Sequence, residues 1–334
     1  MINFYQSDVW RYINASIFQK PIFEINMFGE SYFGTVKSKK KFGFNFQWFQ
    51  IMGIKAGFPN QTSFELLKET IYEISRDYTK DYGNIMFQFG FIDLLSQFPV
   101  SNLKNDEFVS SIRKTREENE SFFINSMHLQ PSFRENMPLS TIIFDLSQGY
   151  DSLFDSMSKS ARAHVNKGNF RNLVFSLADR EQERDEFYQV WFDTSREKGF
   201  NIFPQSTFKL LRDYLISTNN GNLFLAKLDG KIVSGSICFF VGESIIYMYG
   251  ATNRGFGNVG GHHFLKSEIF KRGINNGFRY VDLLGTSPTG YPDHHLCGVS
   301  KFKESLGGNK LEYYGNFDYI LNNHLYKLFK HLKS

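Results

Sequence analysis

The chain has 334 residues, and its 38 Lys and Arg against 34 Asp and Glu give a mildly basic net charge of +4, which suits a phosphate-bearing substrate. Hydrophobic residues make up 41% of the chain, which excludes a mostly disordered protein. The sequence shows no signal peptide, no run of about 18 apolar residues and only two cysteines, so secretion, a membrane-spanning helix and a disulfide framework are disfavoured. We therefore expect a cytoplasmic protein of about two domains, and transient contact with a membrane surface stays open.

The first half of the sequence alternates predicted helices and strands. A helix over 8–18 precedes a β-hairpin, 21–28 with 31–36, whose turn is Gly29-Glu30. The pattern then predicts a strand, an amphipathic helix, another strand and a charged helix, over 45–53, 62–77, 85–91 and 106–120. Pro131 and Pro138 punctuate the segment that follows, which we predict to be the domain boundary.

The second half predicts a similar order of elements. Asp229-Gly230 is a strong hairpin signal, because a type I′ turn needs positive φ at both central positions. The predicted elements are a strand, a helix, a strand, two helices, a three-stranded meander, a glycine-rich loop, a helix and a strand: 139–146, 147–166, 173–177, 180–198, 206–217, 223–249, 253–261, 262–275 and 280–284. A long loop and a final helix-strand-helix follow. We predict two related α+β domains, 1–138 and 139–334, although any α+β protein offers some such matches.

The glycine-rich loop from Arg254 to Gly261 lies between a predicted strand and a predicted helix. Free backbone N–H groups and the helix dipole at such a place can hold a phosphate. The loop partly resembles the pyrophosphate loop of N-acetyltransferases, since Gly257 fits the first glycine, but Val259 stands where a second small residue is expected. A turn that simply leads into the helix is the alternative.

Residue types that bind metals occur in two short runs, which contain His262, His263, Asp293, His294, His295 and Cys297. Adjacent histidines rarely point at one ion, and no pair of ligands stands at i and i+4 on a helix. We therefore expect no metal. Nothing in the local sequence indicates a lowered pKa for Cys297, so a nucleophilic role is disfavoured too.

Basic residues gather in three predicted helices. Lys159 and Arg162 share a helix face, and Arg196 lies near a helix end that Gly199 terminates. A phosphate-facing patch is one interpretation; a solvated face and compensation of the helix dipole are the alternatives. In the triplet Lys301, Phe302 and Lys303, the two lysines project to different sides of any helix, so we expect only one of them to face a cleft.

The segment 298–308 resembles the signature near the C-terminus of the FemABX family, the peptidoglycan-bridge aminoacyltransferases. That signature reads Gly-hydrophobic-x-Lys/Arg-Phe-Lys-x-x-Phe/Leu-Gly-Gly, and this chain has GVSKFKESLGG. Further segments resemble family elements in the same order, at 159–165, 194–199, 249–251 and 277–285. The resemblance spans about 139–308, and no ligand residue of the first half is carried over.

The resemblance implies an α+β fold of two tandem acetyltransferase (GNAT)-like domains, each a mixed, mostly antiparallel sheet flanked by helices. It implies transfer of an activated aminoacyl group from aminoacyl-tRNA, without a bound cofactor, to an amine of an anionic peptidoglycan precursor. Lys303 matches the lysine that stabilises the oxyanion, a role that a preplaced ammonium suits. The expected substrate contacts are Lys159, Arg162, Arg196, Lys301 and Phe302.

Two other functions stay open at this stage. One is an acyl-CoA-dependent N-acyltransferase, which the glycine-rich loop favours. The other is a non-catalytic binder of nucleotide-sugar or cell-wall peptide. The sequence contains no RNA-binding module, so any tRNA would contact dispersed basic residues. No residue of the sequence can be assigned as the general base.

Overall fold

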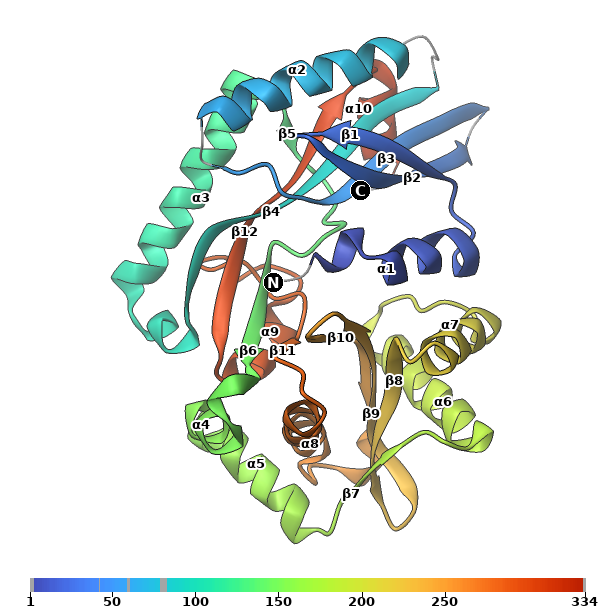
Figure 1. Ribbon diagram of the computed structural model, residues 1–334, viewed down its shortest axis with the longest axis vertical. Helices are drawn as coiled ribbons and strands as arrows, with labels where there is room; N and C mark the ends of the chain where they lie inside the picture. Colours follow the sequence, from blue (N-terminus) through green and yellow to red (C-terminus); the bar gives the residue numbers. More distant parts are fainter. Residues whose placement is uncertain (1–2, 42, 59–60, 79–82, 333–334) are drawn as a thin grey trace.

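The structure of the chain is a computed structural model that describes residues 3–41, 43–58, 61–78 and 83–332. Figure 1 shows two halves stacked along the long axis, with one continuous mixed sheet and helices on its faces. The strands are β1 (Ile22–Met27), β2 (Glu30–Lys41), β3 (Phe44–Ile54), β4 (Asn84–Pro99), β5 (Gln130–Pro131), β6 (Ser140–Asp145), β7 (Val174–Leu177), β8 (Gly221–Leu228), β9 (Lys231–Val241), β10 (Ser244–Thr252), β11 (Tyr280–Asp282) and β12 (Asn309–Ile320).

The α-helices alternate with these strands and cover both faces of the sheet. They are α1 (Asp8–Tyr12), α2 (Gln61–Tyr78), α3 (Asp106–Met127), α4 (Tyr150–Ser156), α5 (Lys159–Phe170), α6 (Glu181–Lys198), α7 (Gln205–Ser217), α8 (Gly261–Asn275), α9 (Cys297–Ser305) and α10 (Asn323–His331). The predicted α+β class, with mostly antiparallel pairing, is confirmed. Among the described residues, no helix is long and apolar enough to cross a bilayer.

The sheet order is β1-β2-β3-β4-β12-β6-β11-β10-β9-β8-β7, and it is nearly symmetric about its centre. In the first half an antiparallel meander, β1-β2-β3, is followed by α2 and by β4, which runs parallel to β3. In the second half the meander β8-β9-β10 is followed by α8 and by β11, parallel to β10. The order of elements that the sequence predicted for both halves is therefore present.

Both central strands come from the second half of the sequence, and one of them joins the first half. β6 pairs with β11 of its own half. β12, which follows α9, pairs with β4 of the first half along its length, from Asn309↔Pro99 to Ile320↔Met86. β6 and β12 also pair with each other. The predicted boundary after residue 138 falls directly before β6, so both central strands belong to the second half of the sequence and β12 extends the sheet of the first half.

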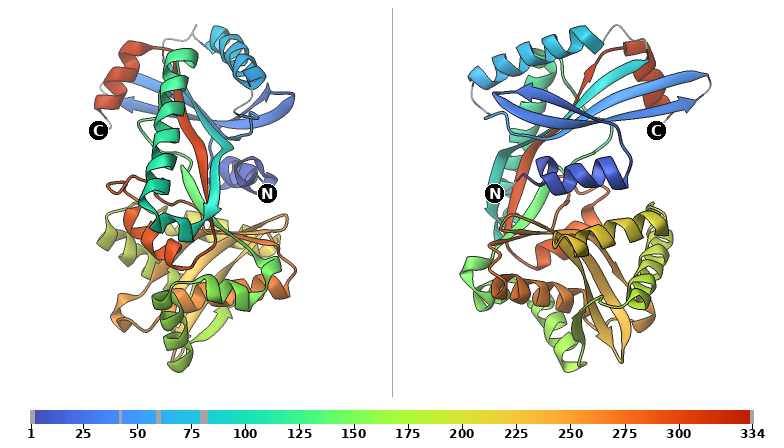
Figure 2. Two further views of the ribbon diagram at one scale, coloured as in Figure 1. Left: turned by 90° about the vertical axis from the view of Figure 1, so that its left-hand side faces the viewer. Right: turned by 45° about the vertical axis from the view of Figure 1, so that its right-hand side comes forward.

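Both ends of the chain likewise pack on the opposite half. In Figure 2, α1 lies between the halves, and its segment buries Phe4, Val9 and Ile13 in the core beneath α6 and α7. At the other end, Phe329 of α10 contacts Phe46 and Trp48 of β3. The burial of these aromatic rings stabilises the contact between distant parts of the sequence.

The structure corrects one predicted helix and lengthens one strand. The helix predicted over 147–166 is two helices, α4 and α5, because Met157 is extended and the Ser158 hydroxyl accepts a hydrogen bond from the Ala161 N–H. The strand predicted over 85–91 continues to Pro99 as β4, since β12 supplies partners over that whole length. At the predicted Asp229-Gly230 hairpin, φ is +50° and +76°, as a type I′ turn requires.

Candidate functional site

A cavity of about 420 Å³ lies between the two halves. It lies where the two parallel strands of each half diverge and stop pairing. β3 and β4 stop pairing after Ile54↔Phe91, and β11 ends at Asp282 while β10 continues to Thr252. The wall is formed by residues of four strands (β4, β6, β11 and β12), by loop residues next to β3, β6 and β11, and by the first described residues of the chain: Asn3, Phe4, Tyr5, Lys55, Gly57, Phe58, Ile92, Asp93, Leu94, Pro138, Thr141, Asp282, Leu284 and Tyr313. Segments remote in sequence thus meet at one site.

Asp93 organises the wall on the first half. Its carboxylate accepts hydrogen bonds from the backbone N–H groups of Ala56 (2.8 Å), Gly57 (2.6 Å) and Phe58 (3.0 Å). These bonds fix the turn that follows β3, and that turn places the exposed Lys55 at the cavity. The sequence pattern gave no signal for either residue, because both depend on how β3 and β4 part.

Asp282 organises the wall on the second half. Its carboxylate accepts hydrogen bonds from the Thr141 hydroxyl on β6 and from the Leu284 N–H (2.7 Å). Burial raises the pKa of Asp282, and these bonds oppose that effect. Asp282 lies in the segment 277–285, which resembles a family element, so the sequence contained a signal for this residue.

Lys303 lies directly behind this wall, on α9. Its ammonium donates to the carbonyl oxygens of Leu284 and Gly285, both at 2.7 Å. Burial lowers the pKa of Lys303 to about 7, against the opposing charge of Asp282. Lys303 is not itself a lining residue of the cavity, so its charge acts on the cavity from behind Leu284.

Phe302 packs inward beside Lys303. Its ring contacts the rings of His262 (4.3 Å between centroids) and His263 (4.9 Å), and the ammonium of Lys266 lies 5.7 Å from its centre. Lys266 is fully buried, 3.4 Å above the centre of the Tyr247 ring, and it finds no hydrogen-bond partner within the described part of the chain.

Burial is the largest influence on the pKa values of Lys266 and His262. It lowers the pKa of Lys266 well below its usual value, and it lowers the pKa of His262 further with the help of the Lys266 and Lys303 charges. The interior behind Lys303 therefore holds basic side chains that water does not reach.

The other predicted substrate contacts are dispersed. Lys159, Arg196 and Lys301 are exposed, and the Arg162 guanidinium donates to the backbone carbonyls of Asp155 (2.8 Å) and Met157 (2.7 Å). None of these side chains is among the residues that line the cavity between the halves. α5 and α6 cover opposite faces of the sheet (Figure 1), so the structure does not bring Arg162 and Arg196 together. Their role in substrate binding stays a prediction.

The glycine-rich loop packs closely on α5. Gly260 has φ +80°, and a Cβ there would lie 2.2 Å from the His164 carbonyl oxygen. Arg254 at the start of the loop forms an ion pair with Glu197 of α6. This close packing explains why residue 260 is a glycine. Phosphate binding by the loop stays a prediction.

Comparisons with known proteins agree on the type of fold. The model of the Acetyltransferase (GNAT) domain matches residues 156–303. The crystal structure of FemX superimposes with a TM-score of 0.67, covering 98% of this chain and 94% of that one at 17% identity, which shows the shared fold. The predicted acetyltransferase-like architecture is thereby confirmed.

The sequence of this chain is also similar to those of curated proteins. A lipid II:glycine glycyltransferase from Staphylococcus haemolyticus strain JCSC1435 is 30% identical over 195 residues, 57% of this chain and 46% of that protein. A second, from Staphylococcus aureus, is 31% identical over 105 residues, 31% of this chain and 25% of the relative. The matched part thus spans about half, or less, of these relatives' length. This chain is thus similar in sequence to these glycyltransferases and similar in fold to FemX.

Proposed function

We propose that the chain transfers an aminoacyl group from aminoacyl-tRNA to an amine of a lipid-linked peptidoglycan precursor. Support comes from the relatives, which are named lipid II:glycine glycyltransferases. The observation that carries the proposal is the position of Lys303, whose buried ammonium lies beside Asp282 and behind the wall of the cavity between the halves. We propose Lys303 as the catalytic residue.

The proposed reaction is an aminolysis of an ester. The acceptor nitrogen bonds to the aminoacyl carbonyl carbon, the ester bond to the tRNA ribose breaks, and the amine proton ends on the ribose hydroxyl. Negative charge builds on the carbonyl oxygen in between, and a positive charge already held in a dry site stabilises it without reorganisation. The two carbonyl contacts of Lys303 hold its ammonium in place before substrate binds.

The acceptor in this proposal lies in the cavity between the halves. Lys55 supplies a positive charge on the first-half wall, and Phe4, Phe58 and Tyr313 supply apolar surface. An anionic sugar-peptide offers complementary groups to both. We infer that Lys55 contacts the acceptor, and we keep Lys159, Arg162, Arg196 and Lys301 as candidate contacts for the larger co-substrate.

The cytoplasm remains the proposed compartment. Both cysteines, Cys238 and Cys297, are free thiols, as expected in a reducing environment.

An N-acyltransferase that uses acyl-CoA is the second candidate. The match to the Acetyltransferase (GNAT) domain model over 156–303, which includes the glycine-rich loop, favours it. In such an enzyme the N-terminus of α8 would receive the pyrophosphate of the cofactor.

One assay separates these functions. The protein is incubated with a lipid II acceptor and either radiolabelled aminoacyl-tRNAs or labelled acetyl-CoA, and label in the acceptor is measured. We expect label from aminoacyl-tRNA alone, and a rate of labelling at least about tenfold lower with the Lys303→Met variant. Label from acetyl-CoA alone would establish the second candidate, and binding of the acceptor without transfer from either donor would indicate the non-catalytic binder.

A further inference from the structure

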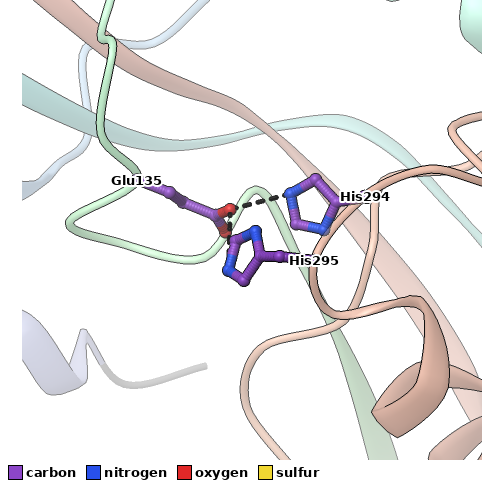
Figure 3. Close-up of side chains that lie close together, drawn as sticks. All are labelled: Glu135, His294 and His295. Atoms are coloured by element: carbon purple, nitrogen blue, oxygen red, sulfur yellow. Dashed lines mark hydrogen bonds and ion pairs between the residues drawn. The ribbon is translucent and has the colours of Figure 1, made fainter. Parts of the chain in front are cut away.

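Three side chains from distant parts of the sequence converge on one point. Figure 3 shows Glu135, His294 and His295, with both imidazole rings turned toward the same carboxylate. Glu135 Oε2 lies 2.9 Å from His294 Nε2 and 4.0 Å from His295 Nε2, and the three potential ligand atoms lie within 4.8 Å of one another. The sequence argued against a metal because adjacent histidines seldom face one ion, but here both rings face the same carboxylate.

The backbone holds this arrangement in position. The other oxygen of Glu135 accepts a hydrogen bond from the Leu139 N–H (2.9 Å), which leaves Oε2 directed at the two rings. Tight turns fix the histidines, since the His294 N–H bonds to the Tyr291 carbonyl and the Cys297 N–H bonds to the His294 carbonyl. Hydrogen bonds of this kind, which orient the ligands from outside, are typical of metal sites.

We propose that Glu135, His294 and His295 bind a divalent transition-metal ion, with zinc as the first choice and water in the open position. Two imidazole nitrogens and a carboxylate oxygen are ligands that zinc prefers. Bonds of about 2.0–2.1 Å in a tetrahedral arrangement place ligand atoms about 3.3 Å apart, and the two measured separations lie on either side of that value.

The hydrogen bonds of His294 fix which ring nitrogen faces Glu135, and that nitrogen is Nε2. In the absence of metal, His294 Nδ1 accepts a weak hydrogen bond from the Leu296 N–H (3.3 Å), so Nε2 carries the proton that faces Glu135. An ion on Nε2 replaces that proton, so binding releases it to solvent.

The position of the site gives it a structural role. His294 and His295 lie in the loop between β11 and α9, and Glu135 lies in the segment before β6. Both segments border the cavity between the halves, through Leu284 and Pro138. A bound ion would fasten them together and brace the wall that Lys303 supports.

Zinc binding tests the proposal directly. Tag-free, full-length protein is dialysed against EDTA, and zinc is then titrated in competition with a chromophoric chelator. We expect about one equivalent of tightly bound zinc and a thermal unfolding midpoint that rises with zinc. His295→Ala should lower the affinity at least tenfold with little effect on the fold, because this side chain is 66% exposed. Glu135→Gln keeps the acceptor for the Leu139 N–H and should weaken binding by a similar factor.

The matched control is His324→Ala, which removes an exposed histidine on α10 and should leave zinc binding unchanged. Cobalt provides a second readout, because its visible absorption bands report the ligands and should change in His295→Ala. Wild-type protein that takes up no zinc, or a His295→Ala variant that binds it as tightly as wild type, would overturn the proposal and leave a simple Glu135–His294 hydrogen bond.

Discussion

At the scale of single residues, the site depends on how one lysine is buried. The Lys303 ammonium is enclosed by two carbonyl oxygens, and Phe302 fills the space beside it. Lys301, two residues earlier, is exposed on the same helix. The basic-aromatic-basic triplet allowed the prediction that only one lysine faces inward, and the family signature indicated which one. The partners of Lys303 could not be predicted, because they lie on a loop whose path the sequence pattern does not determine.

The Lys303→Met variant is the primary test of the site. We expect transfer to fall at least about tenfold, equivalent to 1.4 kcal/mol of transition-state stabilisation. Two buried carbonyls lose their partner, so the free energy of unfolding should fall by about 1–3 kcal/mol. Rates are compared at a temperature where circular dichroism shows both proteins folded. Lys301→Met is the matched control and should keep the wild-type rate within about twofold, and an unchanged rate in Lys303→Met would refute the catalytic role.

The pKa of Lys303 predicts a pH dependence. Because burial lowers this pKa to about 7, the ammonium is present below pH 7 and is lost as the pH rises through that value. If the charge stabilises the oxyanion, kcat should fall on the alkaline side with an apparent pKa near 7. Deprotonation of the acceptor amine acts in the opposite direction and cannot cause this fall. Measured from pH 5.5 to 9, Lys303→Arg should lack the decline, since arginine stays charged.

Asp282 should set the position of that alkaline decline. Its negative charge raises the pKa of Lys303, so Asp282→Asn should move the decline to lower pH. The asparagine oxygen can still accept from the Thr141 hydroxyl and the Leu284 N–H, which limits damage to the fold. The same kcat profile measures the shift. A decline that stays in place, in a folded variant, would mean that the two charges do not interact as described.

At the scale of elements, close helix packing explains two glycines, one of them in the glycine-rich loop whose role the sequence left open. A Cβ on Gly168 of α5 would lie 2.7 Å from Phe264 of α8, and one on Gly260 would meet the His164 carbonyl. The glycine-rich loop therefore lets α8 begin close against α5. Its sequence could be read as a phosphate loop or as a turn, because both uses need the same small residues at the same place.

Alanine substitutions distinguish close packing from backbone conformation alone. Gly260→Ala combines a positive φ with a backbone clash, and we expect a loss of about 3 kcal/mol or more in the free energy of unfolding. Gly277→Ala has a similar φ of +74°, but its Cβ meets nothing within 4 Å among the described residues, so about 1–2 kcal/mol should be lost. Chemical denaturation measures both. Equal losses of stability in the two variants would mean that contact with the His164 carbonyl adds nothing to the cost of Gly260→Ala.

At the scale of the whole molecule, sequence periodicity predicted the elements but not their partners. The meander, the helix and the parallel strand of each half follow from local patterns and turn residues. The pairing of β4 with β12 joins segments more than 200 residues apart, as Asn309↔Pro99 illustrates, and β12 is buried on both faces, so its sequence fits many neighbours. Leu94 and Tyr313 meet in the cavity wall because of this pairing, so Lys303 could be predicted from the sequence but the cavity beside it could not.

The pairing of β12 with β4 of the first half makes the two halves of the chain depend on each other to fold. A fragment of residues 1–138 would lack β12 and leave the edge of β4 open, and a fragment of 139–334 would expose the edge of β12 that β4 covers. Each fragment expressed alone should aggregate or remain unfolded. The two fragments expressed together should associate into a particle of the size of the intact protein. Size-exclusion chromatography distinguishes these outcomes. The intact chain should correspondingly unfold in one cooperative step. Two separate calorimetric transitions, or a soluble folded fragment 1–138, would show that the pairing of β12 with β4 is not needed for folding. Because β12 and β4 join the halves in one sheet, a substitution that destabilises one half should lower the stability of the other as well.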